Sequence, residues 1–305
     1  MRASNALLLD ILAEMAFGDD PLDRIILIAI AEANVIALMS DPSLSHRYAT
    51  LDEPPPDELR HPVSISAVAV RTGMAFETIR RRIRQLAEQG LCELDAEGVR
   101  VPTRIIARVE NNAALTAICG LTRTLYLRLR LNSCLDELAG GNAAAFIGTP
   151  PVRTIDRLTF GHFLRMIAGL ITAIGDLTTA LILLATLREN SEHTANLPST
   201  VVSRGLMPDT LKVSASTATI AAVLELSEAT VGRRLTRLVR EGCCLRRKGG
   251  VIVAASYIQR PEIVALMEFN YTSLLRLFEP LQSLGILAAW EADRACDRPG
   301  LLRQS

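Results

Sequence analysis

TIRRRIRQLAEQGL, residues 78–91, and TVGRRLTRLVREGC, residues 230–243, are two copies of one arginine-rich pattern in a chain of 305 residues. Apolar residues recur at positions i, i+4 and i+7 of each copy, which predicts a helix with one buried stripe. The same offset of 152 positions also aligns GVRVPTRII at 98–106 with GVIVAASYI at 250–258. A constant register over this length predicts that the chain arose by duplication.

Each copy is predicted to contain the same order of elements. Apolar helices come first, at 4–17 and 22–40 in the first copy and at 157–188 in the second. A polar loop and a short helix lead to the repeated helix, and two short extended pieces joined by a glycine-containing turn follow it. A long apolar helix closes each copy, at 103–131 and 260–288. The fold class expected is therefore mainly α with small β-wings.

The predicted organisation is two units joined by a linker. The stretch GGNAAAFIGTPPVRT, residues 140–154, places glycines and prolines at the middle of the chain, as is typical of a linker. We expect a first unit at 1–139, a linker at 140–156 and a second unit at 157–305. The long apolar helices should pack between the units as an internal pseudo-dimer.

A helix, a turn, a second helix and a two-stranded hairpin together resemble the winged helix-turn-helix of bacterial transcriptional regulators. The repeated phrase is similar to a recognition helix of the form S-x-x-T-V-x-R-R-L-x-x-L-x-x-x-G-L, and the order of elements is most similar to the MarR type. The phrase alone fits the GntR, Lrp and Crp types equally well. The resemblance implies a sequence-specific DNA-binding regulator built from two tandem winged-helix units. It also implies a small-molecule effector, bound between the helical interface and the DNA-binding lobes.

The face of each repeated helix outside the buried stripe carries the candidate DNA contacts. Arginine pairs in bidentate fashion with guanine edges and phosphates, and a like-charged i,i+4 pair such as Arg80 and Arg84 destabilises a helix unless an anion neutralises it. The second wing has three consecutive cations, which suits phosphate contacts, whereas Glu93, Asp95 and Glu97 make the first wing acidic. The candidate DNA-binding residues are Thr78, Arg80, Arg81, Arg82, Arg84, Gln85, Thr230, Arg233, Arg234, Arg237, Arg246, Arg247 and Lys248.

Three other interpretations stay open at this point. The arginines could be decoration of a solvated helix face, as the i,i+4 pairs Glu77–Arg81 and Arg237–Glu241 would suggest. Some plasmid replication initiators also carry two winged-helix domains in tandem. A winged-helix scaffold could instead bind protein and not DNA, which the zero net charge and the 49% hydrophobic content would suit.

The sequence predicts no enzyme, no metal site and no cofactor. The four histidines are scattered, the six cysteines form no CxxC pair, and no HExxH, GxSxG, Walker A or dinucleotide-binding motif occurs. The cysteines are expected to be thiols of a reducing compartment.

No membrane association is expected, because the apolar segments carry acidic residues. Segments 25–39 and 166–187 contain Glu32 and Asp176, and Asp10 interrupts the N-terminal apolar stretch. We therefore expect a cytoplasmic protein. Its predicted partners are double-stranded DNA, a small-molecule effector and a second copy of the chain bound through the apolar flanking helices.

Overall fold

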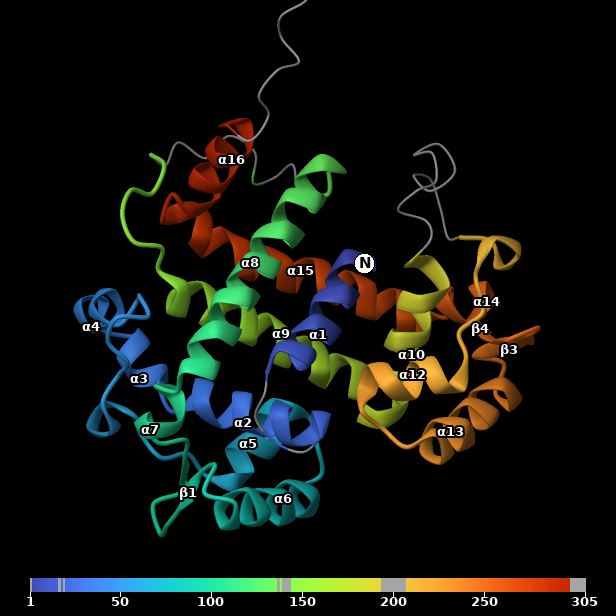
Figure 1. The fold of residues 1–305 in the computed structure, drawn as a ribbon, viewed down its shortest axis with the longest axis horizontal. Helices are drawn as coiled ribbons and strands as arrows, with labels where there is room; N and C mark the ends of the chain where they lie inside the picture. The colour runs from blue at the N-terminus through green and yellow to red at the C-terminus, as the bar shows by residue number, and fades with distance from the viewer. Residues whose placement is uncertain are drawn as a thin grey trace, which may run out of the picture.

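The computed structural model describes residues 2–15, 18, 20–135, 138, 144–192 and 207–296, and Figure 1 shows how its elements are arranged. The protein is 69% helix with a few short strands, which confirms the mainly α prediction. The assignment of the two units as tandem winged-helix modules stays a prediction.

The described helices and strands follow the same order in the two halves of the chain. In the first half they are α1 (Arg2–Glu14), α2 (Pro21–Ala33), α3 (Ile36–Met39), α4 (Pro42–Arg47), the 3-10 turn η1 (Asp57–Leu59), α5 (Ile65–Thr72), α6 (Phe76–Glu88), β1 (Glu93–Leu94), β2 (Val99–Arg100), α7 (Thr103–Ile106) and α8 (Val109–Leu131). In the second half they are α9 (Val152–Ile174), α10 (Leu177–Ser191), η4 (Asp209–Leu211), α12 (Thr217–Leu224), α13 (Glu228–Arg240), β3 (Cys244–Arg247), β4 (Gly250–Val253), α14 (Ala255–Ile258), α15 (Pro261–Ser283) and α16 (Ile286–Cys296).

A pair of buried asparagines shows that the two halves match in side-chain detail. Asn34 and Asn190 each tie a hairpin strand to the segment before it, through two bonds donated by the side-chain amide and one accepted by its oxygen. The partners of Asn34 are His61 O, Val99 O and Val101 N, and those of Asn190 are Val213 O, Val251 O and Val253 N. Each hairpin is antiparallel, β1 with β2 and β3 with β4.

Helices from the two halves interleave at the centre of the molecule. α9 packs against α15, α8 and α10, and also against α2 and α5 of the first half, while α1 packs against α8 and against α10 of the second half. In Figure 1, α1, α8, α9 and α15 form the centre, with the lobe of α2, α5 and α6 on one side and the lobe of α10, α12 and α13 on the other. One large hydrophobic core includes buried residues from both halves, and a second, small cluster in the first half consists of Val35, Leu38 and Tyr48.

Two apolar segments that were predicted as single helices are each broken at a glycine. The segment predicted at 157–188 divides at Gly175, which has a φ of 100°, and Asp176 then caps α10 by accepting from Thr179 N. The segment predicted at 260–288 divides at Gly285, with a φ of 73°. α9 begins at Val152, inside the predicted linker. Residues 140–143 of that linker and residues 193–206 of the second polar loop lie outside the described residues.

α9 is long and apolar enough to cross a membrane by length and composition alone. Its contacts with five other helices are those of a core helix, and a single helix of this kind is weak support for a membrane span. The expected cytoplasmic location and the expected pairing with a second copy of the chain stay predictions.

Candidate functional site

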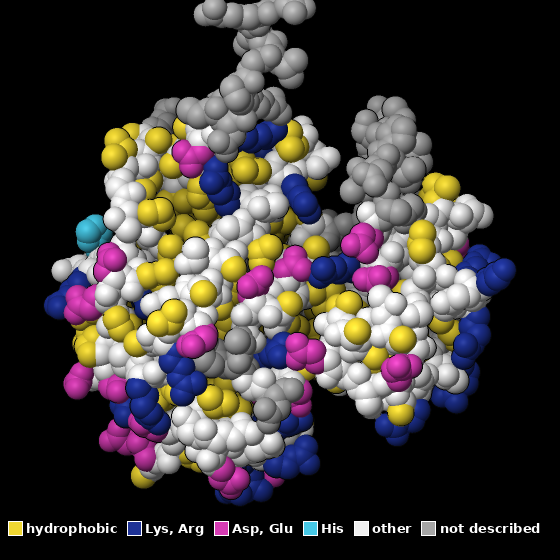
Figure 2. Space-filling model, in the orientation of Figure 1, with side chains coloured by type: hydrophobic (Ala, Val, Ile, Leu, Met, Phe, Trp, Pro, Cys, Tyr) yellow, Lys and Arg dark blue, Asp and Glu magenta, His cyan; other side chains and the backbone are white. Residues whose placement is uncertain are grey.

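The arginine-rich helices α6 and α13 bury the predicted apolar stripe and expose part of the predicted basic face. Ile79, Ile83 and Leu86 are all 0% exposed. Thr78 and Thr230 are half-buried near the start of each helix. The exposed candidates are Arg81, Arg84, Gln85, Arg233, Arg237, Arg246, Arg247 and Lys248. Figure 2 shows basic side chains gathered along the outer edge of the lobe that carries α12 and α13.

Two of the candidate arginines turn toward their own fold. The Arg82 guanidinium lies 2.8 Å from Asp20 Oδ2 and 3.2 Å from Asp23 Oδ1. Arg234 is its counterpart in the second half and lies 2.9 Å from Asp176 Oδ2. Asp20 and Asp176 are the N-caps of α2 and α10. Each of these arginines therefore holds its helix to the start of an apolar helix, and its charge is already paired.

Ion pairs on the exposed faces follow the sequence prediction in one half only. Arg237 pairs with Glu241 at 2.7 Å, as predicted. Glu77 pairs with Arg80 at 2.7 Å, whereas the predicted partner was the next residue, Arg81. Contact of the exposed cations with double-stranded DNA stays a prediction.

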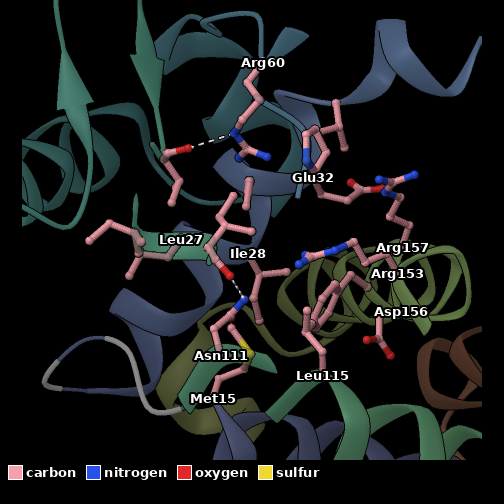
Figure 3. Close-up of a pocket in the computed structure, with 17 residues that line it drawn as sticks. Met15, Leu27, Ile28, Glu32, Arg60, Asn111, Leu115, Arg153, Asp156 and Arg157 are labelled. Carbon is pink, nitrogen blue, oxygen red and sulfur yellow. Dashed lines mark hydrogen bonds between the residues drawn. The ribbon is translucent and has the colours of Figure 1, made fainter. Parts of the chain in front are cut away.

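A cavity of about 100 Å³ lies between α2, α7, α8 and α9, in the first half of the chain (Figure 3). Most of its wall is apolar and comes from four helices and the chain that follows α1. The apolar lining includes Met15, Leu27, Ile28, Ile105, Leu115 and Phe160. The rest of the wall carries charged side chains, which an ordinary hydrophobic core lacks.

Arg60 and Arg153 reach this part of the cavity with nitrogens that have no hydrogen-bond partner. Arg60 is 2% exposed, and its Nε donates to Val101 O at 3.0 Å. Arg153 is 5% exposed, and its Nη2 donates to Asn112 Oδ1 at 3.3 Å. Arg60 Nη2 and Arg153 Nε meet no acceptor among the described residues. Buried donors without acceptors are rare, because each loses its bond to water and gains none.

A third arginine completes the group and raises the local positive charge. Arg157 donates to Tyr48 O at 3.3 Å and contacts Met39 Sδ at 2.8 Å. Burial lowers the pKa of Arg60 to about 9, and repulsion from Arg157 and Arg153 lowers it further while Asp57 opposes the shift. Burial also lowers the pKa of Arg157 to about 10, again with a contribution from Arg153. The three guanidinium groups are thus close enough to repel one another.

The acidic groups of the cavity do not neutralise these arginines. Asp156 is 1% exposed, and neither of its carboxyl oxygens has a hydrogen-bond partner among the described residues. Burial raises the pKa of Asp156 well above its ordinary value, although Arg153 and Arg157 oppose the shift. Glu32, also on the wall, forms an ion pair with Arg71 of α5.

Sequence patterns did not identify this site. Arg153 and Asp156 fell inside the predicted linker, and Arg60 fell in a proline-rich loop that carried no motif. The one local signal is RTIDR at 153–157, where charged residues one turn apart begin an otherwise apolar helix. That signal predicts buried charge on α9, but not the opposing Arg60.

Comparison with known families gives one match. Residues 58–104 match the model of the HemN C-terminal domain, which covers less than one sixth of the 305 residues. No curated protein and no solved structure matches the chain. The matched segment includes α5, α6 and the β1–β2 hairpin, and it contributes Arg60 and Val101 to the cavity.

This match overturns the predicted regulator. The first of the two copies that suggested a MarR-like transcriptional regulator matches a different domain, so that resemblance and the predicted function of DNA-binding regulation are wrong. The replication-initiator and scaffold alternatives belong to the same function prediction, and the match favours neither of them. The HemN domain is associated with the radical SAM, oxygen-independent coproporphyrinogen III oxidase family, so the match also conflicts with the expectation that the chain is not an enzyme.

The part of the chain that the structure describes contains no group of three or more His, Cys, Asp or Glu side chains placed to hold a metal ion. We therefore assign no metal-dependent step to these residues. The chemistry that they do support is the binding of an anion at the arginine end of an apolar cavity.

Proposed function

We propose that the protein binds a small apolar carboxylate in the cavity between α2, α7, α8 and α9. The observation that carries the proposal is a group of three arginines that line the cavity, of which Arg60 and Arg153 are buried and each keep a nitrogen without a hydrogen-bond partner among the described residues. A buried cation without a counterion is strongly unfavourable. A carboxylate would offset that cost, because guanidinium groups bind it in bidentate geometry.

The size and lining of the cavity limit the rest of the ligand. An engineered apolar cavity of about 150 Å³ accepts benzene, and the present cavity is about 100 Å³ and partly open to solvent. Because the present cavity is smaller, a short branched chain would fit against the apolar wall with its carboxylate at the arginine end, whereas a ring would extend through the open side. Small pockets of this kind obtain affinity from the apolar wall and orientation from a few polar groups.

The second half provides an internal comparison that supports the proposal. Lys212 stands at the position equivalent to Arg60, and its Nζ donates to Val253 O at 2.7 Å, as Arg60 does to Val101 O. Unlike Arg60, Lys212 is also paired, with Asp209 at 2.8 Å. At this position the cation of the second half, Lys212, is paired. The cation of the first half, Arg60, keeps a nitrogen without an acceptor among the described residues, and a ligand-binding site requires such a free donor.

The match to an enzyme-associated domain supports a ligand-binding role beside an enzymatic reaction. Arg60 lies within the matched segment, whereas Arg153 and Arg157 come from α9. We assign the first half, covered by α9, as a ligand-binding module, and we assign no reaction step to it.

Isothermal titration calorimetry with benzoate, cyclohexanecarboxylate and 3-methylbutanoate tests the proposal. Benzamide serves as the neutral analogue of benzoate. We expect at least one carboxylate to bind, and its amide to bind at least about tenfold more weakly, because a charge-assisted bond contributes about 1.5–3 kcal/mol.

Arginine variants locate the site. Arg60→Met should remove carboxylate binding, whereas Arg81→Met, which changes an exposed arginine on α6, should leave it unchanged. Circular dichroism establishes that both variants are folded. Absence of binding by all three carboxylates, equal affinity for acid and amide, or equal loss in both variants would overturn the proposal.

A further inference from the structure

We infer that Asp156 makes this cavity selective for carboxylates that also carry a hydrogen-bond donor, a hydroxyl or an ammonium group. This inference rests on the proposed function and narrows its ligand class to small hydroxy or amino acids with an apolar body. Asp156 is buried, and its carboxyl oxygens form no hydrogen bond with any described residue.

The position of Asp156 is that of a binding group. It lies on α9 three residues after Arg153, so that the two side chains share one side of the helix, and both line the cavity. Figure 3 shows Asp156 on the same helix as Arg153 and Arg157, with Arg60 across the cavity. At 1% exposure Asp156 is shielded from bulk water.

The two arginines near Asp156 on α9 form their hydrogen bonds with other groups. Arg153, which lies three residues before Asp156 on the same helix, donates to Asn112 instead, and Arg157 donates to Tyr48. A purely structural aspartate would be expected in an ion pair, since an unpaired buried carboxyl costs stability. The arrangement instead leaves both oxygens of Asp156, a residue of the cavity wall, without a hydrogen-bond partner among the described residues.

Several charged or titratable groups of the described residues lie on α9 beside Asp156 or on the elements that pack against it. On α9 these groups are Arg153 and Arg157, and on α8 the group is Cys119, whose pKa is raised to about 12 by burial and by Asp156. On α2, Glu32 is paired with Arg71. From the loop before α5, Arg60 donates to Val101. None of these groups is hydrogen-bonded to the Asp156 carboxyl.

The chemistry of the carboxyl determines the complementary group. A neutral carboxyl accepts one bond at its carbonyl oxygen and donates one from its O–H, which matches a hydroxyl group that does both. An ammonium group would favour the ionised carboxylate instead and would form an ion pair. In either case the ligand contributes a donor to Asp156 and a carboxylate to the arginines.

Paired titrations test this selectivity in the full chain. Each of the three hydroxybenzoate isomers is compared with the methylbenzoate isomer of the same substitution, and 3-(aminomethyl)benzoate is compared with 3-ethylbenzoate. We expect at least one donor-bearing ligand to bind wild-type protein about tenfold more tightly than its apolar counterpart, which is the effect of one well-formed buried hydrogen bond.

Two substitutions at Asp156 assign the preference to this residue. Asp156→Leu should abolish the preference, and Asp156→Asn should keep it for a hydroxyl but lose it for an ammonium group. Asp52→Asn, at an exposed position, is the matched control. Affinity for unsubstituted benzoate should be the same in Asp52→Asn as in wild type, and circular dichroism should show all three variants folded.

The outcomes separate this inference from the proposed function. If benzoate binds and requires Arg60, but no donor-bearing ligand gains affinity or the gain persists in Asp156→Leu, then the role of Asp156 is refuted and the carboxylate site stands. That result would indicate that an ordered water already satisfies Asp156. If no carboxylate binds at all, both ideas fail.

Discussion

At the residue scale, Asp156 is a group whose burial destabilises the unliganded protein. Its pKa is raised well above the ordinary value of 3.8, so that above this pH the unfolded chain releases a proton that the folded protein retains. Stability is therefore lost as the pH rises from 3.8 toward the folded pKa, by up to about 1.4 kcal/mol per pH unit. A residue that lowers stability in this way is typical of a functional site.

Asp156→Asn removes this proton linkage. We expect the variant to be least stable relative to wild type near pH 4, and its relative free energy of unfolding to increase as the pH is raised toward 7. Urea unfolding followed by circular dichroism measures it at both pH values. The control Asp52→Asn should show no such trend, and a difference that is constant with pH would contradict the argument.

His162 gives the opposite pH dependence. It is 0% exposed and lies 2.9 Å from Ser273 Oγ. Burial, with repulsion from Arg165, lowers its pKa from 6.5 to about 3, although Ser273 opposes the shift. The folded protein keeps the imidazole neutral, whereas the unfolded chain protonates it below pH 6.5. The stability that depends on this neutral ring is therefore complete above pH 6.5 and declines as the pH falls toward 3.

His162→Gln should flatten the acid side of the stability profile. Wild type should lose up to about 1.4 kcal/mol of unfolding free energy per pH unit through this one group, and the variant should lose correspondingly less between pH 6.5 and pH 4. His46→Gln changes an exposed histidine and serves as the control. Parallel profiles for wild type and His162→Gln would show that the ring does not titrate as described.

At the scale of elements, ion pairs fix the arginine-rich helices in place. Arg82 of α6 is 22% exposed and contacts both the N-cap Asp20 of α2 and the buried Asp23. Arg82→Ala should lower the free energy of unfolding by about 1–3 kcal/mol, because partly buried pairs contribute more than exposed ones. Arg81→Ala, one residue away and exposed, should change it by less than about 0.5 kcal/mol.

A double-mutant cycle of Arg82→Ala with Asp20→Ala tests whether the pair itself is responsible. Groups in direct contact are coupled, so the two losses should not add. Additive losses in urea unfolding, or equal losses for Arg82→Ala and Arg81→Ala, would show that this ion pair does not hold α6 against α2.

The elements that the sequence predicted well are those set by local pattern. The i, i+4, i+7 spacing identified Ile79, Ile83 and Leu86 as buried. Helix breaks were missed within continuous apolar runs, because an apolar segment has the same composition whether it forms one helix or two. The cavity was missed for a different reason. Hydrophobic periodicity indicates which face is buried, but not which distant side chain, such as Arg60 opposite Arg153, lies across from it.

At the scale of the whole molecule, the interleaved helices make each half dependent on the other. α1 completes the packing of α10, and α9 completes that of α2 and α5. The cavity shares this dependence, because α9 of the second half supplies Arg153, Asp156 and Arg157 to a pocket of the first. A direct ion pair between the lobes, Arg24 with Glu225 at 2.5 Å, adds to the connection. A change at the cavity can therefore reach both lobes through shared packing.

Shared packing predicts that the two lobes unfold together. Cys92 in the first lobe and Cys244 in the second are 2% and 0% exposed, and burial raises the pKa of each thiol to about 12, so neither should react with a thiol reagent until its lobe opens. In one variant only Cys92 is kept, and in a second only Cys244, with the other cysteines replaced by serine or alanine. Thiol labelling in increasing urea should give the same midpoint for the two, coincident with the loss of helix by circular dichroism. Lobes with independent cores would give separate midpoints, and that result would contradict the single shared core on which the cavity depends.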